Sequence, residues 1–344
     1  MKICHVNLAS GYHGGENQTL QLIKQQLKLG YELTVIANPK SPFAKAVQEL
    51  GCRCILTKHY LFKHQRSITQ GCKVIHVHEG RAIYWALIQH LLYKIPYIIT
   101  RRIDNPLKKK WLSNLAYEKA DALIGLSREI VSRIKSVFPN KPVECIPSSP
   151  VRYPCNEQDV NKIRQQFVGD YLIIHAANML EHKGFDVTVE AARILSKQDP
   201  SIHFALLGDG KIRCELEERA HGLDNISFVG KQEQMGDWFA AADMLVHPSY
   251  SEGLGSVILE ALDAGLPVAA SKAGGIPDII DHGKSGLLIE PGDAKQLAQA
   301  ILDTKNDERL RTSILHGAKL KLKTFRIEYT TQRYEQLYAS LRKE

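Results

Sequence analysis

Short apolar runs recur along the whole chain and alternate with stretches of helical periodicity. Most of these runs are rich in Val, Ile and Leu without alternating polar positions, as expected for parallel strands covered on both faces. Between them lie helical patterns such as Leu20, Ile23 and Leu27, which stops at Gly30. Strands are predicted at residues 3–9, 31–37, 52–57, 73–78, 96–101, 122–127, 143–147, 171–176, 202–207, 226–229, 244–248, 267–271 and 286–289. Repeated strand–helix units predict an α/β fold built on doubly wound sheets.

A proline-dense stretch divides this pattern in two. Residues 147–154 read Pro-Ser-Ser-Pro-Val-Arg-Tyr-Pro, which neither a helix nor the interior of a sheet tolerates. We interpret the stretch as a linker between two Rossmann-like domains, at residues 1–150 and 151–323, followed by a terminal segment at 324–344. A length of 344 residues agrees with two cores of this size better than with one.

The composition favours a protein of the cytoplasm. Hydrophobic residues make up 44% of the chain, yet no run approaches the ~18 apolar residues that span a bilayer. The chain starts directly with a strand-like segment rather than an apolar leader. The seven cysteines contain no CxxC pair, which favours reduced thiols over a disulfide framework or a zinc site.

The charge is unevenly divided along the chain. Residues 1–150 carry 22 Lys and Arg against 9 Asp and Glu, a balance of +13, whereas the remainder carries 23 against 28, a balance of −5. A basic first half indicates an anionic partner there, such as a phosphorylated acceptor, a membrane surface or nucleic acid.

Two loops have the composition of anion-binding sites. Residues 8–17 join the first strand to the first helix and contain Gly11, Gly14 and Gly15, but without the GxGxxG spacing of a dinucleotide site. Residues 249–262 follow a strand and open a helix near Gly255, whose free amides suit a phosphate. Glu252 lies before that helix and Glu260 lies within it, so two carboxylates accompany the helix start.

The second half carries further segments in a fixed order around this pair. They are Asn178-Met-Leu-Glu-His-Lys183-Gly184, Leu207-Gly208-Asp209-Gly210, Gly265-Leu-Pro267-Val268, Ala273-Gly274-Gly275 and Gly286-Leu-Leu-Ile-Glu290-Pro291-Gly292-Asp293. In this order the chain resembles the retaining GT-B glycosyltransferases of family four. The resemblance implies two Rossmann-like domains that face each other across a cleft, and a terminal helix at 324–344 that crosses back to the first domain.

The resemblance also implies roles for individual residues. Glu260 would accept hydrogen bonds from the ribose, Glu252 would meet the donor sugar, and Lys183 would hold the phosphate oxygens and stabilise the departing charge. The glycine loop would face the donor. The implied donor-binding set is Gly14, Gly15, Asn178, Lys183, Glu252, Gly253, Leu254, Gly255, Ser256 and Glu260.

Two positions depart from the family pattern. The family commonly has an arginine where this chain has Asn178, and often a histidine just after the strand at 96–101, where this chain reads Arg101-Arg102-Ile103-Asp104. We suggest that Arg101 or Arg102 supplies the missing guanidinium. Asp104 and His78 are alternative candidates for orienting the acceptor hydroxyl, since His78 ends a strand at the edge where doubly wound sheets bind ligands. For Arg101 and Arg102, a pair of solvated side chains at a strand end is an equal alternative, and for His78 a packed core histidine is an equal alternative. His247 is interpreted as a packed histidine.

Together these features and the resemblance predict a glycosyltransferase that moves a sugar from a UDP- or GDP-sugar to a lipid-linked or surface-glycan acceptor. That it retains the anomeric configuration is implied by the resemblance alone. We expect neither a cofactor nor a metal ion, because there is no DxD motif and Lys183 can carry the leaving-group charge. The lysines at 108–110 beside Trp111, and the basic aromatic stretch 58–66, predict an anionic membrane surface as a partner at the inner leaflet. A nucleotide-sugar epimerase on the same fold is the alternative. A nucleic-acid-binding module is a weaker one, because no recognised motif accompanies the basic half.

Overall fold

The structure is a computed structural model that describes residues 1–12, 14–102, 107, 110–167 and 171–341. Its chain divides into two compact units, one of Met1–Ser149 with Phe325–Glu344 and one of Pro150–Thr324. We call them unit 1 and unit 2 and describe each by itself.

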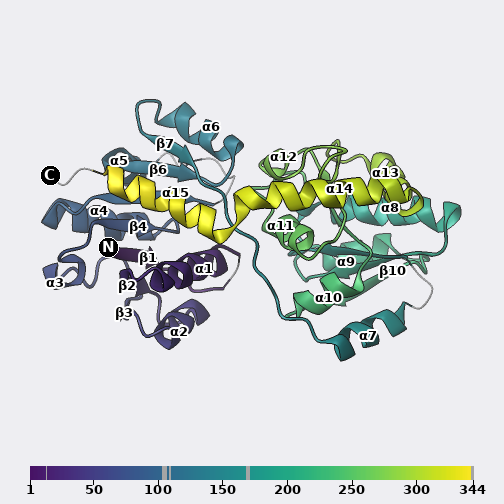
Figure 1. Ribbon diagram of the computed structural model, residues 1–344, viewed down its shortest axis with the longest axis horizontal. Helices are drawn as coiled ribbons and strands as arrows, with labels where there is room; N and C mark the ends of the chain where they lie inside the picture. The colour runs from purple at the N-terminus through teal and green to yellow at the C-terminus, as the bar shows by residue number, and fades with distance from the viewer. Residues whose placement is uncertain (13, 103–106, 108–109, 168–170, 342–344) are drawn as a thin grey trace. The chain divides into compact units, whose positions relative to one another are not determined.

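Unit 1 is a parallel sheet with helices on both faces (Figure 1). Among its described residues the seven strands lie in the order β3-β2-β1-β4-β5-β6-β7, and the neighbours are paired in parallel. The elements are β1 (Lys2–Asn7), α1 (Gly14–Lys28), β2 (Glu32–Ala37), α2 (Pro42–Glu49), β3 (Arg53–Leu56), α3 (Arg66–Thr69), β4 (Val74–Val77), α4 (Ala82–Tyr93), β5 (Tyr97–Arg101), α5 (Trp111–Lys119), β6 (Ala122–Gly125), α6 (Arg128–Val137), β7 (Val143–Cys145) and, from the end of the chain, α15 (Ile327–Ser340).

Unit 2 repeats the same strand pattern. Its six described strands lie in the order β10-β9-β8-β11-β12-β13, again all parallel. The elements are α7 (Glu157–Gln166), β8 (Tyr171–Ala176), the 3-10 turn η1 (Glu181–Lys183), α8 (Phe185–Gln198), β9 (Ile202–Leu207), α9 (Arg213–Arg219), β10 (Ile226–Gly230), α10 (Met235–Ala241), β11 (Met244–His247), α11 (Ser256–Asp263), β12 (Val268–Ser271), α12 (Ile276–Ile279), β13 (Leu287–Ile289), α13 (Ala294–Asn306) and α14 (Glu308–Lys321), with a short 3-10 turn at Leu322–Phe325 after it.

The predicted α/β fold class is confirmed, and each predicted strand overlaps an observed one. Most strands, such as β6 and β12, consist mainly of buried residues, which explains why the runs lack alternation, whereas the edge strands β3, β7 and β10 are partly exposed. The sheets are wound outward in both directions from β1 in unit 1 and from β8 in unit 2. The point where the strand order reverses therefore lies between β1 and β4, and between β8 and β11, where doubly wound folds bind their ligands.

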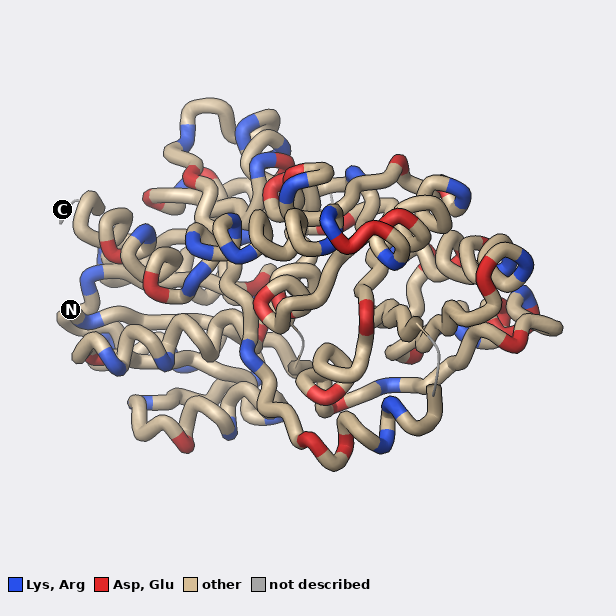
Figure 2. The backbone as a smooth tube through the Cα atoms, turned by 45° about the vertical axis from the view of Figure 1, so that its right-hand side comes forward, with Lys and Arg blue, Asp and Glu red and all other residues tan. Residues whose placement is uncertain are grey.

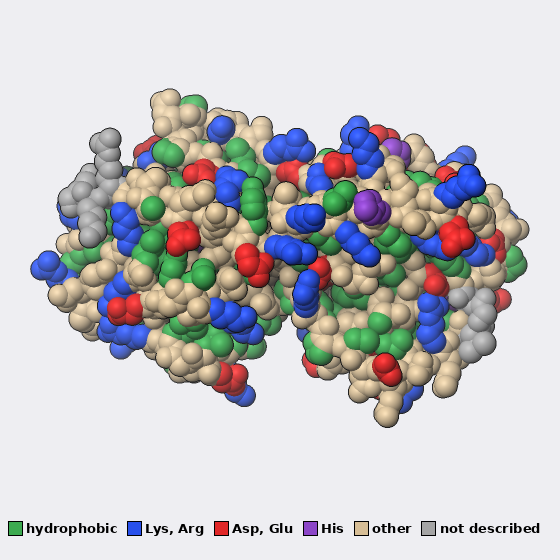
Figure 3. All heavy atoms as spheres, viewed as in Figure 1, with side chains coloured by type: hydrophobic (Ala, Val, Ile, Leu, Met, Phe, Trp, Pro, Cys, Tyr) green, Lys and Arg blue, Asp and Glu red, His purple; other side chains and the backbone are tan. Residues whose placement is uncertain are grey.

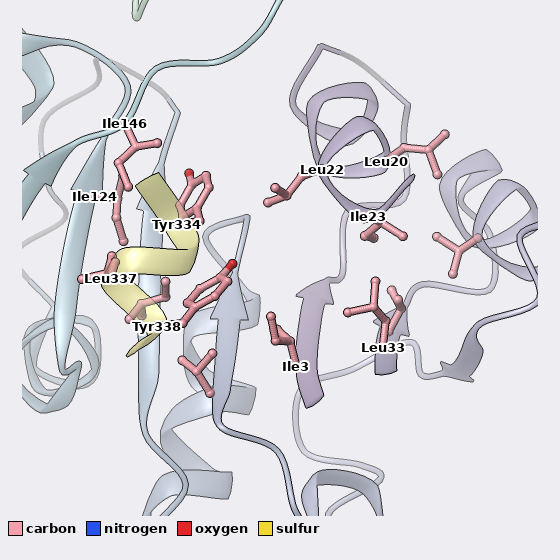
Figure 4. Packing of buried hydrophobic residues seen from close by; sticks show 14 of the residues in the cluster. Ile3, Leu20, Leu22, Ile23, Leu33, Ile124, Ile146, Tyr334, Leu337 and Tyr338 are labelled. Atoms are coloured by element: carbon pink, nitrogen blue, oxygen red, sulfur yellow. The ribbon is translucent and has the colours of Figure 1, made fainter. Parts of the chain in front are cut away.

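The last helix contributes to the core of unit 1. Tyr334, Leu337 and Tyr338 of α15 pack with Ile3, Ile124 and other apolar side chains of the sheet (Figure 4). Unit 2 has its own core, in which Ile173, Phe204 and Val246 of the sheet pack against α8 and α13. Within the described residues no helix is both long and apolar enough to cross a membrane.

Candidate functional site

Lys183 and Glu252 meet in unit 2, beyond the ends of β8 and β11. The Nζ atom of Lys183 lies 2.6 Å from Oε2 of Glu252. The same Oε2 lies 2.9 Å from Nε2 of His247, the last residue of β11. Only 19% of the lysine side chain and 15% of the glutamate side chain are exposed. The structure thus brings together two residues that the sequence placed 69 positions apart, at the point where the strand order reverses.

Two glycines allow the loops of this cluster to approach each other. Gly184 has a φ of +71°, and a Cβ atom there would lie 1.9 Å from the carbonyl oxygen of Pro248. Gly274 has a φ of +52°, and its Cβ would lie 1.9 Å from the carbonyl oxygen of Glu252, which accepts a hydrogen bond from the amide of Gly275. Any larger residue would therefore push Lys183 or Glu252 out of place.

Glu252 is held as a carboxylate. Burial alone would raise its pKa, but the hydrogen bond from His247 and the positive charge of Lys183 outweigh burial and lower the pKa to about 2. His247 must donate this bond from Nε2, and its buried Nδ1 has no hydrogen-bond partner among the described residues. We interpreted His247 as a packed side chain. It is buried, but it also orients Glu252.

The start of α11 lies directly after Glu252. Gly253, Leu254 and Gly255 connect the two, and Ser256 is the first helical residue. The first amides of a helix lack partners within it and carry the positive end of the helix dipole, so this start can hold an anion. Asn178 is exposed two residues after β8.

Glu260 lies one turn further along α11, in a different environment from Glu252. It lines a pocket of about 300 Å³ together with Tyr153 of the linker and Phe239 of α10. Burial raises the pKa of Glu260 to about 8, although a hydrogen bond with Tyr153 opposes the shift. The two glutamates of the motif are thus set apart chemically, one firmly ionised and the other protonated at neutral pH. Sequence reasoning missed Tyr153 because it lies in the proline-dense stretch that we interpreted only as a linker.

This difference predicts how Glu260→Gln changes stability with pH. The pKa of this carboxyl is 4.5 in the unfolded chain and about 8 in the folded protein, so the free energy of unfolding decreases as the pH rises across that window. The neutral glutamine causes no such decrease. We expect the stability of Glu260→Gln to match wild type near pH 4.5 and to exceed it increasingly up to pH 8. The difference in the free energy of unfolding should grow by at most ~1.4 kcal/mol per pH unit, with the melting temperature rising accordingly. Melting curves across this range measure the effect, with Glu233→Gln, an exposed glutamate of unit 2, as the control. Parallel curves for wild type and Glu260→Gln would contradict the raised pKa.

A second pocket lies in unit 1, at the ends of β4 and β5. Its volume is about 310 Å³, and it is lined by Gly15, Glu16, His78, Glu79, Gly80, Ile83, Ile99, Thr100, Arg101, Arg102 and Tyr117. Four of the residues that the sequence analysis singled out therefore share one pocket: Gly15, His78, Arg101 and Arg102. Gly14 is the exposed first residue of α1. Asp104, the other candidate for the acceptor, lies outside the described residues.

Arg102 is tied to neutral groups in this pocket. Its Nη2 atom lies 3.3 Å from Nδ1 of His78, and its Nη1 donates to Oγ of Ser148 at 3.2 Å. Burial lowers the pKa of the guanidinium, and the charge of Glu16, which lines the same pocket, acts in the opposite direction. Arg101 instead contacts Tyr117. Gly15 lies next to this arginine: a Cβ atom at that position would be 3.4 Å from Cδ of Arg102.

Comparisons with known proteins give the family. Residues 12–149 match the family model described as Glycosyltransferase Family 4, and residues 170–307 match the model described as Glycosyl transferases group 1. The chain is 26% identical to the lipopolysaccharide core biosynthesis glycosyltransferase LpsE of Rhizobium meliloti, over 99% of both chains. It is 27% identical to the N-acetyl-alpha-D-glucosaminyl L-malate synthase of Bacillus anthracis over 66% of its own length, and spans 61% of that protein.

Solved structures agree on the architecture. Anabaena Alr3699/HepE in complex with UDP has a TM-score of 0.85 at 20% identity, covering 99% of this chain and all of that one. The lipopolysaccharide outer core galactosyltransferase WaaB has a TM-score of 0.73 at 15% identity, again over 99% of this chain. At these identities the likeness concerns the fold, which is GT-B. With both family models matched, this chain belongs to the glycosyltransferases of group 1 and family 4, and it is a transferase.

Proposed function

We propose that the chain is a retaining glycosyltransferase that takes a sugar from a nucleoside diphosphate sugar and transfers it to a hydroxyl of a glycan or lipid-linked acceptor. UDP is favoured over GDP as the nucleotide of this donor. The observation that carries the proposal is the Lys183–Glu252–His247 cluster beside the start of α11. The solved structure of Alr3699/HepE in complex with UDP supports the choice of base. The comparisons lend no support to an epimerase or to a nucleic-acid-binding module.

The donor is held by unit 2 in this proposal. Glu260 accepts hydrogen bonds from the ribose, and the first amides of α11 with Lys183 hold the diphosphate. Lys183 has three donor hydrogens, so it can keep its bond to Glu252 while contacting a phosphate oxygen. Glu252, fixed as a carboxylate, accepts from a hydroxyl of the sugar. As the bond between the anomeric carbon and the phosphate oxygen breaks, its electron pair stays on the diphosphate, where Lys183 and the helix start stabilise the charge. Because these groups supply the positive charge, the proposal requires no metal ion.

A panel of nucleotides tests this assignment. UDP, GDP, ADP and their glucose conjugates are added to the folded protein, and the melting temperature is measured. A ligand at ~100 times its dissociation constant stabilises by about 2.7 kcal/mol, so a true donor produces a clear shift. We expect UDP and a UDP-sugar to stabilise the protein most. Failure of every nucleoside diphosphate to shift the melting temperature would overturn the proposal.

The acceptor is proposed to lie at an anionic membrane surface, as a precursor of a surface glycan. LpsE is named for lipopolysaccharide core biosynthesis, and it aligns with this chain end to end. Unit 1 carries Lys and Arg along much of its backbone (Figure 2). It also exposes large apolar side chains, including Phe62 at 63% and Trp111 at 76%. Hydrophobic and basic side chains are interspersed on the face of unit 1 drawn in Figure 3.

Vesicle sedimentation checks the membrane proposal. Lys110 precedes α5 and is exposed beside Trp111, whereas Lys108 and Lys109 lie outside the described residues. We expect binding to anionic vesicles but not to neutral ones, because ~1 kcal/mol per basic residue is available only near a negative surface. Binding should weaken at 1 M salt, where the Debye length falls to ~3 Å. Equal binding to both lipids, or binding that is unchanged when lysines 108–110 are replaced by glutamine, would contradict it.

A further inference from the structure

His5 of β1, His76 of β4 and His78, which directly follows β4, form a buried cluster at the pocket of unit 1. His5, His76 and His78 are at most 3% exposed, and one ring nitrogen from each lies within 4.8 Å of the others. Such a cluster has the ligands of a metal site. Each of the six ring nitrogens, however, already lies within hydrogen-bond distance of another group. The guanidinium of Arg102 also contacts one of them. A cation would have to displace these bonds beside a positive charge, so the cluster is better explained as a hydrogen-bond network.

Arg102 sets the direction of this network. A guanidinium has only donors, so the 3.3 Å contact requires Nδ1 of His78 to accept from Nη2. A neutral imidazole carries one N–H, which in His78 is then on Nε2. That N–H points to Nδ1 of His5 at 2.9 Å, which must accept. His5 in turn carries its proton on Nε2 and donates to Oε1 of Gln26 at 2.7 Å.

The chain of bonds continues to the last helix and back. Gln26 uses its carbonyl oxygen for His5, so its amide group donates to the hydroxyl of Tyr338, at 3.4 Å. Among the described contacts of the Tyr338 hydroxyl, Nδ1 of His76 is the one that can accept its proton, at 2.7 Å, so His76 carries its own proton on Nε2 and donates to Oγ1 of Thr100 at 2.7 Å. Each step leaves one donor for the next acceptor. All three histidines therefore hold the same tautomer, with the proton on Nε2.

The environment agrees with neutral rings. Burial lowers the pKa of His5 to about 4, although the hydrogen bond with Gln26 acts to raise it. Burial, together with the neighbouring histidines and Arg102, holds the pKa of His76 and of His78 well below the usual value. A charged His78 would have no lone pair for Arg102.

We infer that His5, Gln26, His76 and Tyr338 are positioning residues that act through His78 on Arg102. The inference rests on the proposed glycosyl transfer and adds to it that the pocket of unit 1 receives a substrate. These hydrogen bonds hold the Nδ1 lone pair of His78 toward Arg102. That lone pair is therefore not available to take a proton from a substrate. The network orients the guanidinium through a neutral imidazole, so the bond to His78 does not neutralise the positive charge of Arg102. It also gives α15 a part in the geometry of the pocket, through Tyr334, which lies 234 residues from Thr100 in sequence, and through Tyr338.

The tautomers can be measured directly in the full chain. Two-bond ¹H–¹⁵N spectra of protein labelled at histidine nitrogens distinguish the Nε2–H form from the Nδ1–H form without any ligand. We expect His5, His76 and His78 to be neutral and Nε2-protonated at pH 7. In Arg102→Met, which removes the obligatory donor, the pattern of His78 and of His5 should change although His5 does not touch Arg102. An Nδ1–H form at any of the three in wild type would overturn the inference.

Activity supplies the second readout. Tyr338→Phe keeps the ring but removes the hydroxyl that joins Gln26 to His76. Losing bonds of this kind should lower the rate constant for nucleoside diphosphate release about two- to tenfold, with the KM for the donor unchanged. Tyr329→Phe, on the same helix and 37% exposed, should retain the wild-type rate. Wild-type rate and wild-type tautomers in a folded Tyr338→Phe protein would refute the positioning role. If no nucleotide-sugar is turned over at all, the proposed function fails while the tautomer pattern still decides this inference.

Discussion

Lys183→Ala should reduce turnover by roughly two to three orders of magnitude, the loss typical when one preorganised donor to a developing negative charge is removed. The Nζ atom of Lys183 is the one positive group bonded to Glu252 beside the start of α11 in the described structure. Its contact with a phosphate strengthens as the diphosphate departs, so the rate constant should fall more than the donor affinity does. The measurement is the release of nucleoside diphosphate from a nucleotide-sugar, with the rate constant and KM determined separately.

The control for this variant is Lys197→Ala. Lys197 lies near the end of α8 with its side chain exposed. The substitution Lys197→Ala removes the same charge from the same unit, and we expect it to leave turnover unchanged. Melting curves must show that Lys183→Ala is folded, since the change also leaves Glu252 with His247 as a partner and without the lysine. A folded Lys183→Ala protein with a wild-type rate would remove Lys183 from the chemistry.

Arg102→Met should lower turnover by about ten- to one-hundred-fold while donor affinity stays near that of wild type. The guanidinium uses two of its five N–H groups on Ser148 and His78, its buried Nε has no hydrogen-bond partner among the described residues, and the residue lines the pocket of unit 1. A hydrogen bond to a charged group is worth ~1.5–3 kcal/mol, which gives the expected range. Methionine keeps much of the apolar stem, so the loss reports the charge. Steady-state rates together with a separate binding titration of the donor measure both quantities.

Arg133→Ala is the matched control, because Arg133 is an exposed arginine of α6 in the same unit. If Arg102→Met weakens donor binding as strongly as it slows turnover, Arg102 holds the donor in the ground state instead. Wild-type turnover in the folded variant would mean that Arg102 serves unit 1 only as a structural cation.

Local sequence signals were sufficient for the strands. Buried parallel strands such as Ile202–Leu207 need a continuous apolar run, and that run is visible without knowledge of the partners. The loop containing Glu252 could be predicted for the same reason, because a strand end, two glycines and a helix start are consecutive in the chain.

Partners distant in sequence could not be predicted in this way. Tyr338 lies 312 residues from Gln26 and Tyr153 lies more than 100 from Glu260, and no local pattern links either pair. His247 was visible at the end of its strand, but a buried histidine in a core and one that donates to a carboxylate look alike in sequence. Only the 2.9 Å contact with Glu252 separates them.

Unit 2 is proposed to bind a nucleoside diphosphate through the segment that carries Glu252 and Glu260. Calorimetric titration of UDP into wild type, Glu260→Gln and Glu233→Gln tests it most directly, at pH 8.5, where Glu260 with a pKa of about 8 is largely ionised in the empty protein. Loss of a charged acceptor costs ~1.5–3 kcal/mol, so UDP should bind Glu260→Gln about ten- to one-hundred-fold more weakly, and Glu233→Gln as wild type does. Equal UDP affinity in folded wild type and Glu260→Gln would contradict the account.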